Sequence, residues 1–257
     1  MMTPVSCYIR TLNEAHNIER CIRSAQQVAD EVVVVDSGSS DDTVRIAESL
    51  GARVLLNAWP GNGFQKRFAE DQCRHDWLLD LDADEVVTKA LADEIRRTVD
   101  AAGQSAGIFS IPLITVSPLG QRFFHSAVAR RNKLYNRRVV RMPADRAWDQ
   151  FQLPDGHRAV PLRATLEHWS YSSLEQLVAK FNRSSSARAA NTLLPALWKI
   201  RFRILFGYPF YFFQFYISRA WFRAGWEGLC IALIAAFGRL LRDIKRHERA
   251  LAERSKR

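Results

Sequence analysis

The sequence has 257 residues, 47% of them hydrophobic, which is enough for a buried core and excludes a wholly disordered chain. Its net charge of +10 is uneven: residues 1–115 carry 11 Lys and Arg against 18 Asp and Glu, whereas residues 116–257 carry 26 against 9. Four scattered cysteines without a C-x-x-C pair argue against a zinc site or a disulfide framework. No long apolar run opens the chain, so we expect no signal peptide.

The charge asymmetry indicates two kinds of partner. The acidic part can hold a metal ion, and the basic part should attract something anionic. Large apolar and aromatic residues are mixed with the basic ones, which favours an anionic membrane surface or a phosphorylated lipid. Zinc-finger and RNA-binding signatures are absent from the sequence, so we expect no nucleic-acid partner.

The first third of the chain alternates strand-like and helix-like segments. The run Val32–Val35 is β-branched throughout, as expected of a strand that is covered on both sides. Strands are predicted at Val5–Ile9, Val32–Val35, Arg53–Leu56 and Trp77–Leu81, and helices at Glu14–Gln27, Asp42–Leu50 and Phe64–Arg74. This order predicts an α/β fold in which a mostly parallel sheet has helices on both faces.

The middle of the chain is less regular. A helix is predicted at Lys89–Ala101, a strand at Gly107–Pro112 and another helix at Ser173–Ala190. Between Ser117 and Thr165 the apolar runs are short and Arg, Pro and Asn are frequent. We expect this segment to supply strands and loops that complete the sheet.

The last part of the chain is rich in large apolar residues. Phe202–Trp226 is dominated by Phe, Tyr and Trp, Gly228–Gly238 is apolar, and Arg239–Arg257 is strongly charged. A transmembrane helix needs about 20 apolar residues, and arginines interrupt both apolar runs too soon. We therefore predict amphipathic helices in the membrane interface or a shallow re-entrant hairpin; a pair of soluble core helices is the alternative.

Asp82 and Asp84 follow directly after an apolar strand and are separated by one residue. Open α/β sheets bind ligands beyond the carboxyl ends of their strands, so this pair lies where a site is expected. Carboxylate oxygens suit Mg²⁺ or Mn²⁺, and such an ion can neutralise a departing diphosphate. Asp80 begins the same run, and we expect it to face elsewhere. An isolated pair of this kind can equally be a solvated acidic turn before a helix.

Two more polar clusters follow two other strands. Asp36 ends one strand and can accept from a base N–H or a ribose hydroxyl, and Gly38 allows a ligand to approach the backbone closely. Asp42 and Thr43 are assigned to helix capping. Thr11–Glu14 follows the first strand. Because three clusters at three strand ends meet at one edge of the sheet, chance is a poor explanation for them.

Together these segments resemble glycosyltransferase family 2, and more narrowly the bacterial lipopolysaccharide core glycosyltransferases of that family. The most specific segments are Thr11–Glu14 with Ile18, Val34–Thr43 and Leu79–Glu85. The segments Gly63–Ala69, Leu134–Arg138, Leu166–Tyr171 and Gly225–Gly228 also look like that subgroup. The resemblance therefore spans nearly the whole chain.

The resemblance implies a GT-A fold, an inverting mechanism and Mg²⁺ or Mn²⁺ as the cofactor. The nucleotide-sugar-binding residues that it implies are Thr11, Asn13, Glu14, Asp36, Gly38, Lys66 and Asp82. Asp82 and Asp84 would contact the metal and the diphosphate, with His168 as a later ligand of the metal or phosphate. A structural role is the alternative for His168, and a solvated helix lysine is the alternative for Lys66.

The resemblance does not supply the catalytic base, because the subgroup carries a His-Glu pair that this chain lacks. An inverting transfer needs a carboxylate that deprotonates the acceptor hydroxyl as it attacks. The spacing to Gly156 and His168 leads to Asp149 as the candidate base, with Asp155 as the second candidate.

The expected function is inverting transfer of a sugar from a nucleotide-diphosphate donor, such as a UDP-sugar, to a saccharide or lipid-linked acceptor. The pathway would be synthesis of lipopolysaccharide core or another cell-envelope glycan, with the protein cytoplasmic and peripheral on the inner face of the bacterial inner membrane. Three regions are expected: a nucleotide-sugar-binding α/β half (1–115), an acceptor-side half of the same domain (116–190) and a membrane-associating helical region (191–257). Alternatives are a polyprenyl-phosphate sugar synthase and a non-catalytic glycosyltransferase-like scaffold at the membrane.

Overall fold

The computed structural model describes residues 2–103, 107–117, 120, 122, 129–190 and 193–255. The chain divides into two compact units. The α/β unit comprises residues 1–115 and 128–170, and the helical unit comprises 116–127 and 171–257. The second boundary predicted at residue 190 therefore falls after Ser170 instead, because the helix that precedes residue 190 packs within the helical unit.

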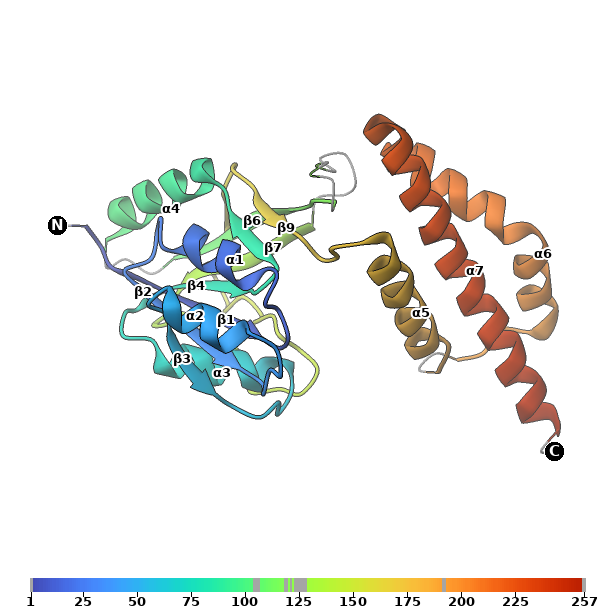
Figure 1. The fold of residues 1–257 in the computed structure, drawn as a ribbon, viewed down its shortest axis with the longest axis horizontal. Helices are drawn as coiled ribbons and strands as arrows, with labels where there is room; N and C mark the ends of the chain where they lie inside the picture. The colour runs from blue at the N-terminus through green and yellow to red at the C-terminus, as the bar shows by residue number, and fades with distance from the viewer. Residues whose placement is uncertain are drawn as a thin grey trace. The chain divides into compact units, whose positions relative to one another are not determined.

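Four parallel strands form one half of the sheet of the α/β unit, in the order β3-β2-β1-β4 (Figure 1). These strands are β1 (Val5–Thr11), β2 (Glu31–Asp36), β3 (Arg53–Leu56) and β4 (Trp77–Asp82). Helices α1 (Ile18–Ala25), α2 (Thr43–Ser49) and α3 (Asn62–Gln72) connect them. The predicted alternation of strands and helices is confirmed, and the strands' carboxyl ends share one edge.

The second half of the sheet contains antiparallel pairs. Its strands are β5 (Glu85–Val87), β6 (Ile108–Thr115), β7 (Ala129–Asn136), β8 (Val160–Pro161) and β9 (Leu166–His168). Strand β7 runs antiparallel to β4 and β6, and β5 runs antiparallel to β9. The predicted completion of the sheet by the middle of the chain is confirmed for β7 and β8, and the whole sheet is mixed.

Helices cover both faces of the sheet, as predicted. Cys7 and Ile9 of β1 point into a core shared with α1, α2 and α4 (Lys89–Ala102). Tyr8, between them, points to the other face, where α3 and the segment 140–151 form the second core. This alternation is the two-residue period of a strand that is buried on both sides.

In its described residues the helical unit contains three long helices and two short helical turns. They are α5 (Leu174–Ala190), α6 (Leu197–Phe213), the π-helical turn η1 (Gln214–Ser218), the 3₁₀ turn η2 (Trp221–Ala224) and α7 (Gly225–Ser255). Helix α7 packs against both α5 and α6 (Figure 1). The ammonium of Lys245 donates to Asn182 Oδ1 at 2.6 Å, and the hydroxyl of Tyr211 donates to Asp243 Oδ2 at 2.6 Å.

One helical stretch of the described chain, Trp221–Ser255, is long and apolar enough to cross a bilayer by length and composition. Its most apolar window has a mean hydropathy of 1.5, and a third of that window is buried in the unit. The prediction that the apolar runs are too short to span is wrong by length, because the helix continues through Arg239. The continuous helix passes the length test, although this alone does not distinguish a span from a packed helix.

Candidate active site

The loops after β1 and β2 are joined by hydrogen bonds at the carboxyl edge of the sheet. Asn13 Oδ1 accepts from the backbone N–H of Ser40 at 2.8 Å, and the hydroxyl oxygen of Ser39 accepts from the Asn13 N–H at 2.8 Å. Asn13 has a φ of 54°, in the left-handed region that Asn tolerates better than most residues. The structure therefore brings the first two polar clusters together.

Asp36 holds the turn that follows it. Its Oδ2 accepts from the backbone N–H groups of Gly38 at 2.8 Å and Ser39 at 2.7 Å, and Gly38 has a φ of 101° that favours glycine. Asp36 is only 1% exposed, so its buried carboxylate holds the backbone of this loop in place. A nucleotide that binds against this loop would meet a loop backbone that is already ordered.

The cap of α2 differs from the prediction. Asp41 Oδ1 accepts from the backbone N–H of Thr43 at 3.1 Å, whereas the side chain of Asp42 forms an ion pair with Arg45. The hydroxyl of Thr43 accepts from the Glu14 N–H at 2.8 Å. Asp42 therefore holds the N-cap position, as predicted, but its side chain forms no capping hydrogen bond. The capping assigned to Thr43 is wrong, because Thr43 is the first residue of the helix and links it to the β1 loop.

Glu14 and Thr11 carry the polar atoms best suited to meet a ligand at the end of β1. Burial raises the pKa of the Glu14 carboxyl; the hydrogen bond from Asn17 opposes this, and nearby Asp84 adds to it. The hydroxyl of Thr11 is buried without a hydrogen-bond partner in the described part of the chain. A buried hydroxyl of this kind is expected to find a partner when a ligand binds.

Lys66 is buried beneath this edge. Its ammonium lies 2.7 Å from Asp80 Oδ2, and the two side chains are 1% and 0% exposed. The alternative of a solvated helix lysine is therefore wrong. Asp80 also points into the site region, contrary to expectation, because residues 80 and 82 share one face of β4.

Asp82 is surrounded by three cations. Its carboxylate lies 2.5 Å from Arg10 Nε, 3.6 Å from Lys133 Nζ and 3.9 Å from Lys66 Nζ. Burial alone would raise the pKa of Asp82, but Lys66, Lys133 and Arg10 together hold it well below its usual range. The first aspartate of the pair is therefore firmly ionised, and its charge is neutralised by the protein itself.

Glu85 lies at the other side of Lys133. Its Oε2 accepts from Lys133 Nζ at 2.6 Å and from the backbone N–H of Asp82 at 2.8 Å. Burial raises the pKa of Glu85 to about 7, in spite of the opposing charge of Lys133, and Asp82 adds to the rise. This carboxyl supports the turn that presents Asp82 and Asp84.

Asp84 lies next to His168. Strand pairing places Glu85 opposite His168, so the residue before β5 meets the end of β9, and Asp84 Oδ2 lies 3.0 Å from His168 Nε2. The two residues are 84 positions apart in sequence. The structure thus brings together two of the three residues predicted to hold a metal.

Asp149 reaches the same cluster from a loop. Its Oδ2 accepts from Arg10 Nη2 at 2.8 Å and lies 3.7 Å from Lys66 Nζ, and its side chain is 31% exposed. Arg10 therefore bridges Asp82 and Asp149. Asp155 is exposed in a turn, and no hydrogen bond or ion pair of its carboxylate to this cluster is found among the described residues.

The loop that carries Asp149 is anchored to the start of α3. The backbone N–H of Gly63 donates to the Asp145 carbonyl at 2.9 Å, and that of Asn62 donates to the Arg146 carbonyl at 2.9 Å. A Cβ on Gly63 would lie 2.3 Å from the Trp148 carbonyl oxygen, so only glycine permits this approach. The Gly61-Asn62-Gly63 turn thus fixes where Asp149 lies.

A metal ion fits part of the predicted ligand set. Asp84 and His168 offer a carboxylate oxygen and an imidazole nitrogen 3.0 Å apart, a donor pair that suits a divalent ion. Asp82 is already neutralised by its three cations. No group of three or more His, Cys, Asp or Glu side chains gathers at one point in the described ranges, so a metal here would also need ligand atoms from the substrate or water.

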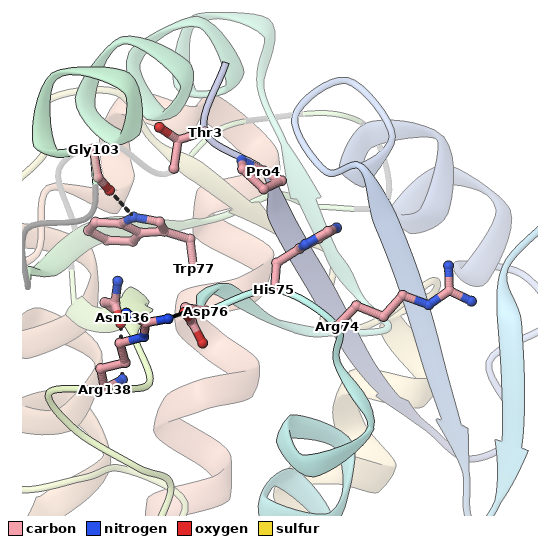
Figure 2. Close-up of a pocket in the computed structure, with 9 residues that line it drawn as sticks. All are labelled: Thr3, Pro4, Arg74, His75, Asp76, Trp77, Gly103, Asn136 and Arg138. Carbon is pink, nitrogen blue, oxygen red and sulfur yellow. Dashed lines mark hydrogen bonds and ion pairs between the residues drawn. The ribbon is translucent and has the colours of Figure 1, made fainter. Parts of the chain in front are cut away.

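The opposite edge of the sheet carries a separate small cavity of about 160 Å³ (Figure 2). It lies at the amino ends of β1 and β4, where Trp77 Nε1 donates to the Gly103 carbonyl at 2.8 Å and Arg138 pairs with Asp76 at 2.6 Å. None of the site residues predicted from the sequence lines this cavity. The carboxyl edge, rather than this cavity, therefore holds the candidate active site.

Sequence reasoning missed Arg10, Lys133 and the role of Glu85. Arg10 lies in the otherwise buried strand β1, and Lys133 begins the buried half of β7. A buried cation is rarely tolerated without a carboxylate partner, so a charge inside each strand was the available signal. Their partners could not be identified, because they come from other strands and from a distant loop.

Comparisons with known proteins agree with this geometry. The sequence model of the family described as glycosyl transferase family 2 matches residues 6–150. An uncharacterized glycosyltransferase of Rickettsia bellii is 35% identical over 96% of this chain and 87% of its own length. The lipopolysaccharide core biosynthesis glycosyltransferase LpsC of Rhizobium meliloti is 27% identical over 96% of this chain and 93% of its own.

Among solved structures, a crystal structure of glucosyl-3-phosphoglycerate synthase from Mycobacterium tuberculosis, in complex with Mn²⁺, UDP and glucosyl-3-phosphoglycerate, is 27% identical. The overlap covers 45% of this chain and 43% of that one, with a TM-score of 0.35. The family match and the full-length relatives identify the α/β unit without it. The chain belongs to glycosyltransferase family 2 and is a glycosyltransferase with the GT-A fold.

Proposed function

We propose that this glycosyltransferase moves a sugar from a nucleotide-diphosphate donor, a UDP-sugar in the first instance, to an acceptor hydroxyl with inversion at the anomeric carbon. The observation that supports this best is the convergence of Asp84, His168 and Asp149 on the carboxyl edge where the β1 and β2 loops are joined. Ligands of open α/β sheets bind at this edge.

The nucleotide would lie across the loops after β1 and β2. Thr11, Asn13 and Glu14 line the first loop, and Asp36 with Gly38 orders the second. Lys66 and Arg10 lie beneath the expected position of the diphosphate, where they balance Asp82. Fixed charges of this kind stabilise developing negative charge without having to reorganise.

A divalent ion, Mg²⁺ or Mn²⁺, would be held by Asp84 and His168. It would neutralise the charge of the departing nucleoside diphosphate. The imidazole nitrogen favours Mn²⁺ over Mg²⁺, because Mg²⁺ prefers an all-oxygen shell. Asp82 would act through Arg10 and the two lysines rather than as the main ligand.

Asp149 would serve as the catalytic base. The acceptor oxygen forms its bond to the anomeric carbon while the bond from that carbon to the diphosphate oxygen breaks, and the hydroxyl proton passes to the Asp149 carboxylate. Arg10 orients this carboxylate, and the turn at Gly63 holds its loop. Asp155 is the second candidate.

The acceptor would be a saccharide or a lipid-linked saccharide, in synthesis of lipopolysaccharide core or another cell-envelope glycan. The full-length similarity to LpsC supports this class of acceptor. A protein that modifies such an acceptor benefits from residing at the membrane, because both molecules are then confined to one surface.

The exposed face of α6 supports attachment to an anionic membrane. Trp198, Phe202, Leu205, Phe206, Phe210 and Phe213 lie on that face and are 58% to 73% exposed. The opposite face, with Ile200, Gly207 and Tyr211, is buried. Helix α6 contains no acidic residue but has Lys199, Arg201 and Arg203 among its aromatic residues. An apolar face of this size, bordered by cations, is typical of helices in the headgroup region.

We accordingly place the protein in the cytoplasm, peripheral on the inner face of a bacterial inner membrane. Residues 116–257 carry 26 Lys and Arg against 9 Asp and Glu, which complements anionic lipids. A second copy of the chain is the alternative partner for the exposed face of α6. Concentration-dependent dimers without vesicle binding would favour it.

A donor screen tests the proposed chemistry. Release of nucleoside diphosphate is measured for a panel of sugar nucleotides with Mg²⁺ or Mn²⁺, with and without a lipid-linked saccharide. Asp84→Asn should reduce turnover about 10²–10³-fold without loss of folding, whereas Asp42→Asn, at an exposed ion pair, should match wild type. Normal turnover of a folded Asp84→Asn variant would remove Asp84 from the site.

A further inference from the structure

A cavity of about 270 Å³ lies where α5, η1 and α7 meet in the helical unit. The charged side chains of its lining are all cationic. Four arginines and two serines contribute to it: Arg188, Arg219, Arg239, Arg242, Ser184 and Ser185. No Asp or Glu lines this arginine cavity within the described part of the chain. Cations gathered around an open space form a binding site for an oxyanion.

Aromatic rings hold two of these arginines in place. The Arg239 guanidinium lies 4.8 Å from the ring centre of Phe215 and 5.6 Å from that of Tyr211, and the Arg219 guanidinium lies 5.1 Å from Phe215. A guanidinium held over a ring keeps N–H donors at its edge, in the planar geometry that matches phosphate.

Arg239 and Arg242 have polar partners within the helical unit, and Arg239 donates to Gln214 Oε1. Arg242 forms an ion pair with Asp243 at 3.2 Å. Burial, and then the proximity of Arg242 and Arg219, lowers the pKa of Arg239. Arg239 therefore lies in a field of like charge, which a bound dianion would relieve.

A second, larger cavity of about 510 Å³ adjoins the first between α5 and α7. Phe181 and Gly238 line both cavities. The other lining residues of this apolar cavity are Val178, Ala179, Ile234, Phe237 and Leu241, with Glu175 and Asn182 as its polar members. A Cβ on Gly238 would lie 2.9 Å from the Phe181 ring, so this glycine lets the ring lie between the two cavities. A charged and an apolar cavity that share a wall suit an amphiphile.

We propose that the helical unit binds a lipid phosphate, with the phosphate group in the arginine cavity and the hydrocarbon chain in the apolar cavity. A free phosphate shares the headgroup chemistry but would leave the apolar cavity unused. The inference does not rest on the proposed transfer reaction, since binding needs neither a sugar nucleotide nor the α/β edge.

Calorimetric titration of the full-length protein with soluble probes tests this site. The probes are short-chain phosphatidic acid below its micelle concentration, glycerol phosphate, inorganic phosphate and short-chain phosphatidylcholine. Phosphatidic acid should bind at least about tenfold more tightly than glycerol phosphate, because its chains add apolar burial. Phosphatidylcholine, with no net charge, should bind least.

Variants separate the two cavities. Arg239→Gln and Arg219→Gln should each weaken phosphatidic acid and glycerol phosphate about tenfold, because each removes a charge-assisted hydrogen bond. Val178→Asn should weaken phosphatidic acid alone. Arg254→Gln, an exposed charge near the end of α7 that does not line the cavity, is the matched control and should leave both affinities unchanged. Circular dichroism melting checks that each variant is folded. If Arg239→Gln does not fold, Arg219→Gln still tests the arginine cavity, because Arg219 lies in a turn.

Three outcomes would count against the proposal. Absence of phosphatidic acid binding by wild type would overturn it, and so would equal losses from Arg254→Gln and Arg219→Gln. Inorganic phosphate that binds as tightly as phosphatidic acid, with no effect of Val178→Asn, would overturn the lipid assignment in favour of a free-phosphate site.

Discussion

The α/β unit and the helical unit differ in where they place charged and large apolar side chains. In the α/β unit the buried cations are matched to carboxylates, as in Lys66 with Asp80 and Lys133 with Glu85. In the helical unit, arginines gather around the arginine cavity and six large apolar side chains of α6 face outward. The first unit pairs its buried charges across the sheet, whereas the second gathers cations around a cavity and exposes large apolar side chains.

The difference indicates which measurement reports on the function of each unit. Matched buried charges position catalytic groups at the cost of desolvation, so their removal should affect stability and turnover. Cations that line an open cavity and exposed apolar groups contribute little to the unit's own folding, so their removal should affect binding. Four predictions test this contrast, beginning with the largest effect.

Asp149→Asn should lower the rate of transfer by about 10²–10⁴-fold while the donor affinity stays near wild type, because Asn keeps an oxygen that accepts from Arg10 but cannot take up the acceptor's proton. The measurements are turnover with a saccharide acceptor and the dissociation constant for the sugar nucleotide. Asp155→Asn is the matched control at an exposed turn and should be active. The reverse pattern would assign the base to Asp155.

Lys66→Met should destabilise the α/β unit by about 3–5 kcal/mol, because it leaves the Asp80 carboxylate buried and deprived of its nearest cation. Guanidinium unfolding measures the change. Lys89→Met, which breaks an exposed pair with Asp93, should cost about 0.5 kcal/mol or less. The double variant Lys66→Met/Asp80→Asn should recover part of the loss. A Lys66→Met variant as stable as Lys89→Met would contradict the matched-charge view.

Phe206→Ser and Phe210→Ser should each weaken binding to anionic vesicles about tenfold or more, because each exposed ring would bury against lipid. Co-sedimentation with vesicles measures this, and unfolding of the unit should change little. Leu56→Ser removes an equally exposed apolar side chain from the α/β unit and is the control. Unaltered vesicle binding by both α6 variants would show that this face has another partner.

Glu85→Gln should remove one component of the pH dependence of stability. The pKa of Glu85 is raised from an ordinary value of 4.5 to about 7, so the folded state retains a proton that the unfolded state loses. Its contribution is fully present below pH 4.5 and is lost as the pH rises to about 7, with a slope of at most about 1.4 kcal/mol per pH unit.

Asp82 acts in a different window. Its depressed pKa gives a contribution that is present above its ordinary value of 3.8 and is lost as the pH falls below it. Denaturant unfolding of wild type and Glu85→Gln between pH 4.5 and 7.5 therefore isolates Glu85. Identical slopes for the two proteins would show that this carboxyl ionises in the same way in the folded and unfolded chains.

The sequence by itself determined the parallel half of the sheet and the edge at which the site lies. Continuous apolar runs such as Val32–Val35 need cover on both faces, and polar clusters after such runs must emerge at the strand ends. Both inferences are local, because they depend only on the spacing of apolar residues along the chain and on the residues that follow each strand. Family resemblance added the identity of the reaction but not the environment of any residue.

Tertiary structure alone decided the partners of those residues. Arg10 joins Asp82 to Asp149 across 72 and 139 positions, and β5 meets β9 so that Asp84 reaches His168. Only the packed fold shows that Lys66 is buried, that α5 belongs with α7, and that four arginines from α5, α7 and the turn after η1 line one cavity. Contacts between distant segments depend on how elements pack, and packing does not follow from the local period of the sequence.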